Sequence, residues 1–494
     1  MKKVLALTVL TALFLTAGCG RVGHDGSPDA KAAADLAARV IPDAASHFSF
    51  ETLPADTADF FTLRSEGSRI VIGGNNANSM AVGLNHYLKY WCHVNIGWFA
   101  WDKGTMPKTL PSVETPVRHE ARVPERFFLN YCTYGYTMPW WGWKEWEHFI
   151  DWMALNGINL PLAITGQESI WYQVWTELGL SDEEVRMYFT GPAHLPWHRM
   201  LNIDRWGGPL PKSWLEGQEA LQKQIVARER ELNMKPVLPA FAGHVPPELQ
   251  RIYPDAKIER MSDWAGFALE DYPWFLDPED PLFPVIQKKF LDKEVEIYGT
   301  DHVYGIDIFN EMIPKSWEPD YLAGVSKGVY ESLAAADPDA TWLQMTWLFY
   351  NERKYWFEGD SDERVEAFLT SYPAEKSILL DYYCERMEPT DNLFDGYAVF
   401  SVYAISFFRY APVGFHKAAV EAVRQWPFRV GLGQSGVVGF NFSLTHTAVE
   451  IICRCLHNVA ATVETHTLKV CLTVDYVGYP IGKIRCRFAR TFWH

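Results

Sequence analysis

The chain has 494 residues, of which 48% are hydrophobic and 21% are charged. This length exceeds one ordinary domain, and the composition excludes an intrinsically disordered protein. The formal net charge of −16 disfavours nucleic acid and anionic lipid surfaces as partners, because both bind clustered Lys and Arg. Aromatic residues make up 15% of the chain, including 21 Trp. Either an aromatic core or stacking on sugar rings explains this excess.

The first residues read as an export signal. Lys2 and Lys3 precede an apolar stretch over residues 4–15, which is too short to span a bilayer. The run Leu-Thr-Ala-Gly-Cys at 15–19 resembles a bacterial lipobox, so residues 1–18 are predicted to be removed and Cys19 to carry a lipid. An ordinary secretory signal is the alternative. We therefore expect an exported protein, in the periplasm or at the cell surface, anchored to the membrane only through this lipid.

Two segments follow the signal. Residues 19–36 are rich in Gly, Ala and Asp, which predicts a flexible tether. Strand-like runs then cover 47–53, 60–64 and 68–73, and a helix is predicted over 77–91. These elements predict a small α/β domain over residues 37–118, followed by a polar connection that ends at Pro124.

Strands and helices alternate regularly from Arg126, which is typical of a parallel sheet with crossover helices. The six predicted strands cover 126–130, 158–164, 235–240, 302–309, 341–346 and 377–381. A (β/α)8 barrel has two more strands. The predicted fold is therefore a TIM-like barrel over residues 126–395.

The helices of this domain carry recognisable signals. After the first strand, apolar residues recur at helical spacing on one face: Trp146, Phe149, Ile150 and Met153. Ser181 with Glu184 and Ser213 with Glu216 match the capping-box pattern, and Gly299 is placed to end the helix before the fourth strand. These signals support helical crossovers between parallel strands.

The character of the chain changes after Asp395. Residues 396–494 contain four acidic residues against ten Lys or Arg, whereas the whole chain is strongly acidic. Four of the eight cysteines also fall there, and neither a CxxC pair nor zinc-ligand spacing occurs. We predict a segment that does not continue the barrel. A genuine accessory domain and translation in a shifted reading frame both explain it.

Candidate functional residues come from the strand ends, because active sites of TIM barrels lie at the C-terminal ends of the strands. Glu311 follows the fourth strand in an apolar setting beside Phe309 and Met312, as a general acid requires. A solvated loop glutamate is the alternative. Asp381 and Glu385 are further carboxyl groups at this end.

Other strand ends carry polar and aromatic residues. Asn130 and Cys132 follow the first strand, and no base can be assigned to activate the cysteine as a nucleophile. Trp197 and Trp347 could stack on a sugar, although a lone Trp more often packs in a core. His244 ends the third strand and is as well explained by a structural role. It has no second His or carboxylate at metal-ligand spacing, so no metal site is predicted.

Six collinear stretches resemble one enzyme family, the α-N-acetylglucosaminidases of glycoside hydrolase family 89. They read IDWMALNGINL (150–160), GQE (166–168), FTGPA (189–193), VLPAFAGH (237–244), GTDH (299–302) and FNEM (309–312). The resemblance covers roughly residues 40–390. It implies an exo-acting retaining hydrolase that removes terminal α-linked N-acetylglucosamine from glycans and needs no metal or cofactor.

The resemblance also implies roles for single residues. Glu311 corresponds to the acid/base glutamate of the family, which works with a second, nucleophilic glutamate about 5 Å away. The positions assigned to substrate binding are Asn130, Cys132, Tyr136, Trp197, His244, Asn310 and Trp347.

The chain departs from the family pattern in the segment where the nucleophilic glutamate is expected. Glu421, Glu450 and Glu464 do not stand in matching sequence contexts, and the expected helical C-terminal domain is not recognisable. A reading frame that slips near residue 395 accounts for this loss, and it predicts that the chain as printed is inactive. The alternative function is a noncatalytic glycan-binding lipoprotein at the cell surface.

Overall fold

The computed structural model describes residues 22–99, 105–358, 361–381 and 398–401. These residues divide into two compact units. The first consists of the chain up to Pro124 together with Glu147–Gly157 and Glu231–Asn233. The second consists of Glu125–Trp146, Ile158–Arg230 and the chain from Met234 onward.

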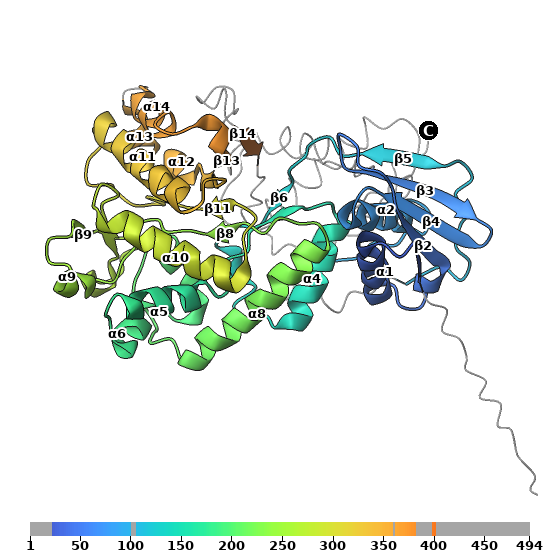
Figure 1. Cartoon of the computed structure of the whole chain (residues 1–494), viewed down its shortest axis with the longest axis horizontal. Helices are drawn as coiled ribbons and strands as arrows, with labels where there is room; N and C mark the ends of the chain where they lie inside the picture. Colours follow the sequence, from blue (N-terminus) through green and yellow to red (C-terminus); the bar gives the residue numbers. More distant parts are fainter. Residues whose placement is uncertain (1–21, 100–104, 359–360, 382–397, 402–494) are drawn as a thin grey trace, which may run out of the picture. The chain divides into compact units, whose positions relative to one another are not determined.

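The first unit is built on a five-stranded mixed sheet with the order β1-β2-β4-β3-β5. Its strands are β1 (Gly23–His24), β2 (Phe48–Thr52), β3 (Phe60–Glu66), β4 (Arg69–Gly74) and β5 (Val117–Glu120). Strand β4 pairs parallel with β2 and antiparallel with β3. Helices α1 (Pro28–Val40) and α2 (Ala77–Tyr90) pack against each other and against this sheet (Figure 1). The predicted small α/β domain is therefore present.

Helix α1 corrects one prediction, because residues 28–36 are not a flexible tether. The side chain of Ser27 caps the helix by accepting a hydrogen bond from the Ala30 amide at 3.1 Å. Alanine has the highest helix propensity, and all alanines of α1 except Ala38 are buried. Near the end of the helix, Arg39 donates two hydrogen bonds of 2.7 Å to the buried carboxylate of Asp151, within the same unit. A composition that suggests a linker thus forms the first packed helix.

The second unit contains the barrel strands, all parallel. They are β6 (Phe127–Phe128), β7 (Leu160–Pro161), β8 (Leu238–Pro239), β11 (Val303–Gly305), β12 (Thr341–Met345), β13 (Ser377–Asp381) and β14 (Ala398–Ser401). Strand β6 pairs with β7, and a parallel bridge joins Leu162 to Val237 beside β8. Strands β8, β11, β12, β13 and β14 then follow in one sheet. All six predicted strands are found, and each neighbours the next one along the chain.

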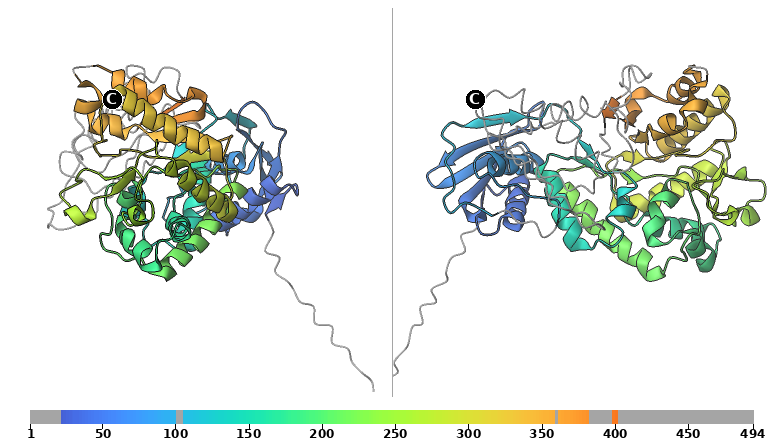
Figure 2. Two further views of the ribbon diagram at one scale, coloured as in Figure 1. Left: turned by 60° about the vertical axis from the view of Figure 1, so that its left-hand side comes forward. Right: turned by 180° about the vertical axis from the view of Figure 1, so that it is seen from behind.

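Helices connect these strands and lie outside them (Figure 1, Figure 2). The long ones are α5 (Gln167–Glu177), α8 (Lys212–Glu231), α10 (Leu282–Tyr298) and α11 (Pro319–Ala336). The shorter ones are α3 (Thr133–Tyr136), α6 (Asp182–Tyr188), α7 (Leu195–Arg199), α9 (Leu249–Ile252), α12 (Trp347–Asn351), α13 (Arg353–Trp356) and α14 (Glu363–Leu369). An antiparallel hairpin, β9 (Ile258–Arg260) and β10 (Trp274–Leu276), is inserted between β8 and α10. Figure 2 shows the strands enclosed by these helices.

The helix signals are confirmed at three of four places. Helix α4 (Trp143–Leu155) buries Trp146, Phe149, Ile150 and Met153. Ser181 and Glu184 form a capping box at α6, and Gly299 ends α10 with φ 73°. The Ser213 cap is wrong, because α8 begins at Lys212 and the serine lies inside the first turn.

The barrel extends beyond its predicted boundary at residue 395. Strand β14 pairs parallel with β13 in four-residue register, from Ile378 opposite Ala398 to Asp381 opposite Ser401. The predicted end of the domain is therefore wrong by at least this strand. The rest of the segment 396–494 lies outside the described residues. No helix in the described ranges is long and apolar enough to cross a membrane.

Candidate active site

Glu311 lies in a strained turn after β11. Phe309 and Glu311 both have positive φ, at 58° and 55°. An aromatic or charged residue rarely adopts this left-handed conformation, and such strain concentrates at functional sites. The predicted strand 302–309 consequently ends early, at Gly305, and the chain turns to present Glu311 at the C-terminal end of the sheet.

Two indole groups hold the Glu311 carboxyl group. The Nε1–H of Trp264 donates to Oε2 at 2.6 Å, and the Nε1–H of Trp347 donates to Oε1 at 2.7 Å. Trp347 comes from the start of α12, directly after β12, as its predicted position at a strand end requires. Each carboxyl oxygen therefore has an indole donor, and within the described residues no salt bridge contributes to its orientation.

Trp264 is a site residue that the sequence did not reveal. It lies between β9 and β10, in a turn where Ala265 and Gly266 have φ 52° and 77°. Its ring stacks on Phe267 with centroids 5.8 Å apart. Because it follows no barrel strand directly, the strand-end rule passes over it. A loop insertion rich in aromatic residues near the third strand is the signal that could have found it.

Aromatic rings continue the site away from Glu311. Trp197 of α7 approaches Trp264 with centroids 6.3 Å apart and meets Tyr136 edge-on at 5.6 Å. Tyr136 is 64% exposed, which leaves its ring available at the surface. Helix α7 is anchored because Arg199 donates two hydrogen bonds, of 2.7 and 2.8 Å, to the buried Glu168 carboxylate. The prediction that Trp197 and Tyr136 share one site is supported by this geometry.

Cys132 lies close enough to interact electrostatically with Glu311. Burial, followed by the charges of Glu311 and Asp307, raises the pKa of its thiol to about 12. A thiol that stays protonated at neutral pH is a poor nucleophile, as the sequence predicted. The neighbouring Asn130 uses its amide oxygen to accept hydrogen bonds from the Thr133 amide (2.9 Å) and hydroxyl (2.7 Å). Its oxygen therefore holds Thr133, the first residue of α3.

Asn310 is buried and ties Glu311 to the loop after α7. Its carbonyl accepts a hydrogen bond from the Asn202 side chain at 2.7 Å, and its own amide nitrogen lies 3.5 Å from the sulfur of Met200. The loop after α7, the helix that carries Trp197, thus also fixes the backbone beside Glu311.

Asp307 is a second carboxyl group on β11's C-terminal side. It is 3% exposed, and among the described residues neither of its oxygens has a hydrogen-bond partner. Burial, and then the charge of Glu311, raises its pKa well above the usual range. Burial therefore favours the neutral form of this carboxyl group.

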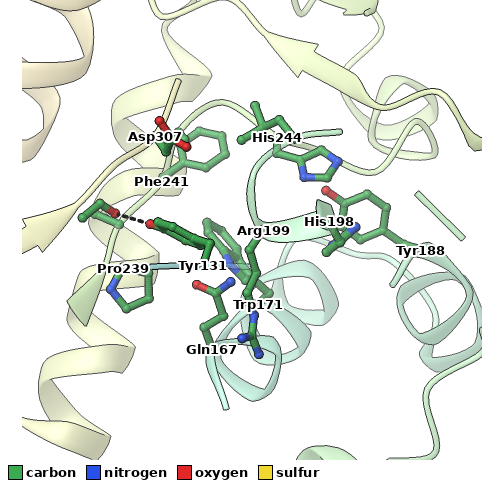
Figure 3. A pocket seen from close by; sticks show the side chains of 14 residues that line it. Tyr131, Gln167, Trp171, Tyr188, His198, Arg199, Pro239, Phe241, His244 and Asp307 are labelled. Atoms are coloured by element: carbon green, nitrogen blue, oxygen red, sulfur yellow. Dashed lines mark hydrogen bonds between the residues drawn. The ribbon is translucent and has the colours of Figure 1, made fainter. Parts of the chain in front are cut away.

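His244 does not belong to the group around Glu311. It is buried and its Nε2 lies 2.6 Å from Oδ1 of Asp204, whose side chain also contacts His198. Together with Asp307, Tyr131 and Arg199, both histidines line a cavity (Figure 3). The contact of His244 with substrate stays a prediction.

The predicted site residues thus do not all lie in one place. Trp347, Trp197, Tyr136 and Cys132 gather around Glu311, joined by Trp264. Asn130 accepts a hydrogen bond from the backbone at the start of α3, and the backbone of Asn310, next to Glu311, accepts one from Asn202. Asp381 ends β13, while Glu385 and Cys19 lie outside the described residues. Possible metal ligands converge at two places in the described ranges, His198–Asp204–His244 and His302–Asp337–Asp339.

Comparison with known proteins shows the class first. Residues 126–401 match the family model described as the alpha-N-acetylglucosaminidase (NAGLU) tim-barrel domain, and residues 31–112 match the N-terminal domain of the same name. The second unit is therefore a TIM-barrel domain. The chain belongs to the alpha-N-acetylglucosaminidase family.

A curated relative and two solved structures agree with this membership. The chain is 38% identical over 390 residues to the alpha-N-acetylglucosaminidase of Homo sapiens, covering 78% of this chain and 52% of the relative. It thus spans about half the length of that protein. A family 89 glycoside hydrolase from Clostridium perfringens in complex with 2-acetamido-1,2-dideoxynojirmycin is 30% identical, with a TM-score of 0.67, covering 74% of this chain and 41% of that one.

The second structure contains a substrate. It is a variant of the Clostridium perfringens protein in which two glutamates are replaced by glutamine, in complex with its substrate GlcNAc-alpha-1,4-galactose. It is 30% identical with a TM-score of 0.65, over 72% of this chain and 39% of that one.

Proposed function

We propose that the protein is an exo-acting α-N-acetylglucosaminidase that removes terminal α-linked N-acetylglucosamine from glycans with retention. The observation that carries this proposal is Glu311 at a strand end of a family barrel, with one indole donor on each carboxyl oxygen. The substrate bound to the Clostridium perfringens relative supports the α-linked N-acetylglucosamine terminus.

Glu311 is the acid/base group in this mechanism. It gives a proton to the glycosidic oxygen while the bond from that oxygen to the anomeric carbon breaks and a carboxylate attacks the carbon. Glu311 then takes a proton from the water that releases the sugar. Trp264 and Trp347 orient its two oxygens, and the exposed ring of Tyr136 beside Trp197 offers an apolar face for the sugar.

The nucleophile has to be another carboxylate. Asp307 interacts with Glu311, but it is 3% exposed and burial raises its pKa, which favours the neutral form and makes it a poor nucleophile. The acidic residues after residue 395 do not match the family, so the prediction stands that the chain as printed is inactive. Restoring the reading frame is predicted to restore the nucleophile.

Hydrolysis of an aryl α-N-acetylglucosaminide tests this proposal. The frame-restored protein should cleave the α-anomer and leave the matched β-anomer intact, and proton NMR should show α-N-acetylglucosamine as the first product. The chain as printed should show almost no turnover. β-configured first product, or cleavage of both anomers, contradicts the mechanism.

The encoding DNA separates the enzyme from the alternative. A single-base insertion or deletion near codon 395, with family sequence resuming in another frame, favours the enzyme. An intact frame, together with saturable binding of GlcNAc-α-1,4-galactose and no turnover, favours the glycan-binding lipoprotein.

We also propose a lipid anchor on Cys19 and an exported location, from the lipobox at 15–19. Replacing Cys19 with Ala should abolish incorporation of labelled palmitate and move the protein from the membrane to the soluble fraction. A variant that stays bound to the membrane contradicts the anchor.

A further inference from the structure

We propose that His198, Asp204 and His244 form a binding site for one divalent transition-metal ion of the zinc class. The ion would fix the loop between α7 and α8 and take no part in the reaction. The proposal does not depend on the proposed function, because the proposed mechanism assigns no step to any of the three side chains.

The three ligands come from three segments. His198 belongs to α7, Asp204 to the loop after it, and His244 to the loop after β8. One carboxylate oxygen of Asp204 lies 2.6 Å from Nε2 of His244 and 3.2 Å from Nδ1 of His198, and all three ligand atoms lie within 4.8 Å of one another. Tetrahedral zinc with bonds of about 2.0–2.1 Å holds its ligands about 3.3 Å apart. Small side-chain movements therefore bring these atoms to coordination distance.

The Asp204 carboxylate points to a missing ligand. Its side chain is 1% exposed, and Oδ2 has no hydrogen-bond partner within the part of the chain that the structure describes. Buried carboxylate oxygens nearly always have a partner. An ion held at this cluster would give Oδ2 of Asp204 a partner.

The charges favour a cation. Asp204 presents a buried carboxylate to two imidazole rings, those of His198 and His244. The adjacent Arg205 is paired with Glu248 at 2.5 Å. Carboxylate oxygen and imidazole nitrogen are donor atoms that bind zinc and similar ions.

The surroundings resemble an outer layer of a metal site. The ring of His244 is also hydrogen-bonded by the backbone of His198, the type of contact that orients metal-bound histidines. Tyr188 packs edge-on against both histidines, at 4.7 and 5.2 Å. Figure 3 shows these three rings together at one side of the cavity, which could admit water as a further ligand.

The second cluster provides the contrast. His302 is exposed, and both oxygens of Asp337 already accept hydrogen bonds, one from His302 (2.8 Å) and Tyr304 (2.7 Å), the other from the Asp339 amide (3.1 Å). Neither oxygen of Asp337 lacks a partner, in contrast to Oδ2 of Asp204, so a variant at His302 is a matched control.

Metal titration of the full chain tests the proposal. The protein is prepared without a polyhistidine tag, treated with a chelator, and titrated with Zn²⁺ by calorimetry and with Co²⁺ by visible absorption. We expect one tight equivalent. Asp204→Asn and His244→Gln should each weaken binding at least about 100-fold, whereas His302→Gln should leave it unchanged. Zn²⁺ should also raise the thermal midpoint of the wild type and the control only.

Two results would overturn the proposal. One is a chelator-treated wild type that binds no equivalent of either metal, which would make the cluster a hydrogen-bonded clamp. The other is tight binding that folded Asp204 and His244 variants retain. Circular dichroism establishes folding, and if both variants fail to fold, His198→Gln and the Co²⁺ spectrum of the wild type decide in the same way.

Discussion

Glu311 and Asp307 stand four residues apart after the same strand, yet their surroundings are opposite. Glu311 is half-buried, and each of its oxygens accepts a hydrogen bond from an indole. Asp307 is almost fully buried and, in the described ranges, accepts none. Both carboxyl groups follow the same strand, so their different surroundings come from the side chains around them.

The difference follows from what each environment does to charge. Burial without donors penalises the charged form of Asp307. Both residues lie in the segment after β11, where Phe309 and Glu311 adopt a left-handed backbone conformation. Four experiments sharpen or break the comparison.

Replacing Glu311 with Gln should have the largest effect. In the frame-restored protein we expect kcat to fall by on the order of 10³-fold or more, because glutamine cannot transfer the proton. Hydrolysis of an aryl substrate with a poor leaving group measures this. Glu331→Gln, on the exposed face of α11, is the control and should keep full activity. Full activity of Glu311→Gln would remove the central assignment.

Removing one indole donor should have a smaller effect. A hydrogen bond to a charged group contributes about 1.5–3 kcal/mol, so Trp264→Phe and Trp347→Phe should each lower kcat/KM by about 10- to 100-fold. Steady-state kinetics of the frame-restored protein would measure this loss. Trp140 is 70% exposed, so Trp140→Phe is the control. If Trp264→Phe behaves like Trp140→Phe, the contact with Glu311 does not matter for catalysis.

Asp307→Asn should make the protein more stable at neutral pH. The folded pKa of Asp307 lies above the unfolded value of about 3.9, so the native state keeps a proton that the unfolded chain loses. The free energy of unfolding of the wild type then falls as pH rises above about 4, by up to about 1.4 kcal/mol per pH unit, until the folded pKa is reached.

Asparagine has no ionisable carboxyl group, so the Asp307→Asn variant lacks this dependence of stability on pH. Urea unfolding at pH 4 and pH 7 should show nearly equal stability at the lower pH and a gain of at least about 1 kcal/mol for Asp307→Asn at the higher one. The stability of the variant is compared with that of the wild type at each pH. If this difference turns against the variant between pH 4 and pH 7, Asp307 is ionised in the folded protein.

Cys132, which interacts with both carboxyl groups, should show the smallest effect. With its pKa raised to about 12, the thiol should react with iodoacetamide at pH 7.5 far more slowly than free cysteine, as mass spectrometry of the labelled peptide would show. Cys132→Ser should change kcat by less than about threefold. Rapid labelling would contradict the buried, protonated thiol.

Local patterns predicted most of the fold. The strand–helix alternation from Arg126 and the capping box at Ser181 depend on residues close together in the sequence, and both are confirmed. Helix α1 was mistaken for a tether because alanine-rich composition is shared by linkers and buried helices. Strand β14 was missed because it is only four residues long and follows a change of composition.

The site was less predictable, for a physical reason. Glu311 and Trp347 follow barrel strands, so topology alone brings them together. Trp264 reaches Glu311 from an inserted hairpin, and Asp204 meets His244 across 40 residues of sequence. Such contacts depend on how loops fold back over the barrel. No spacing rule for metal ligands or strand ends captures them.

The spatial order of the barrel strands also allows the barrel to assemble during synthesis. Since β6 to β14 neighbour one another in the order of their synthesis, every new strand can dock on one already made, and assembly can proceed while the chain emerges. The newest strand is always the open edge of the sheet. A ribosome that stalls or changes frame partway leaves that edge unpaired, and unpaired edges invite aggregation. Errors late in this message therefore place a demand on chaperones and proteases.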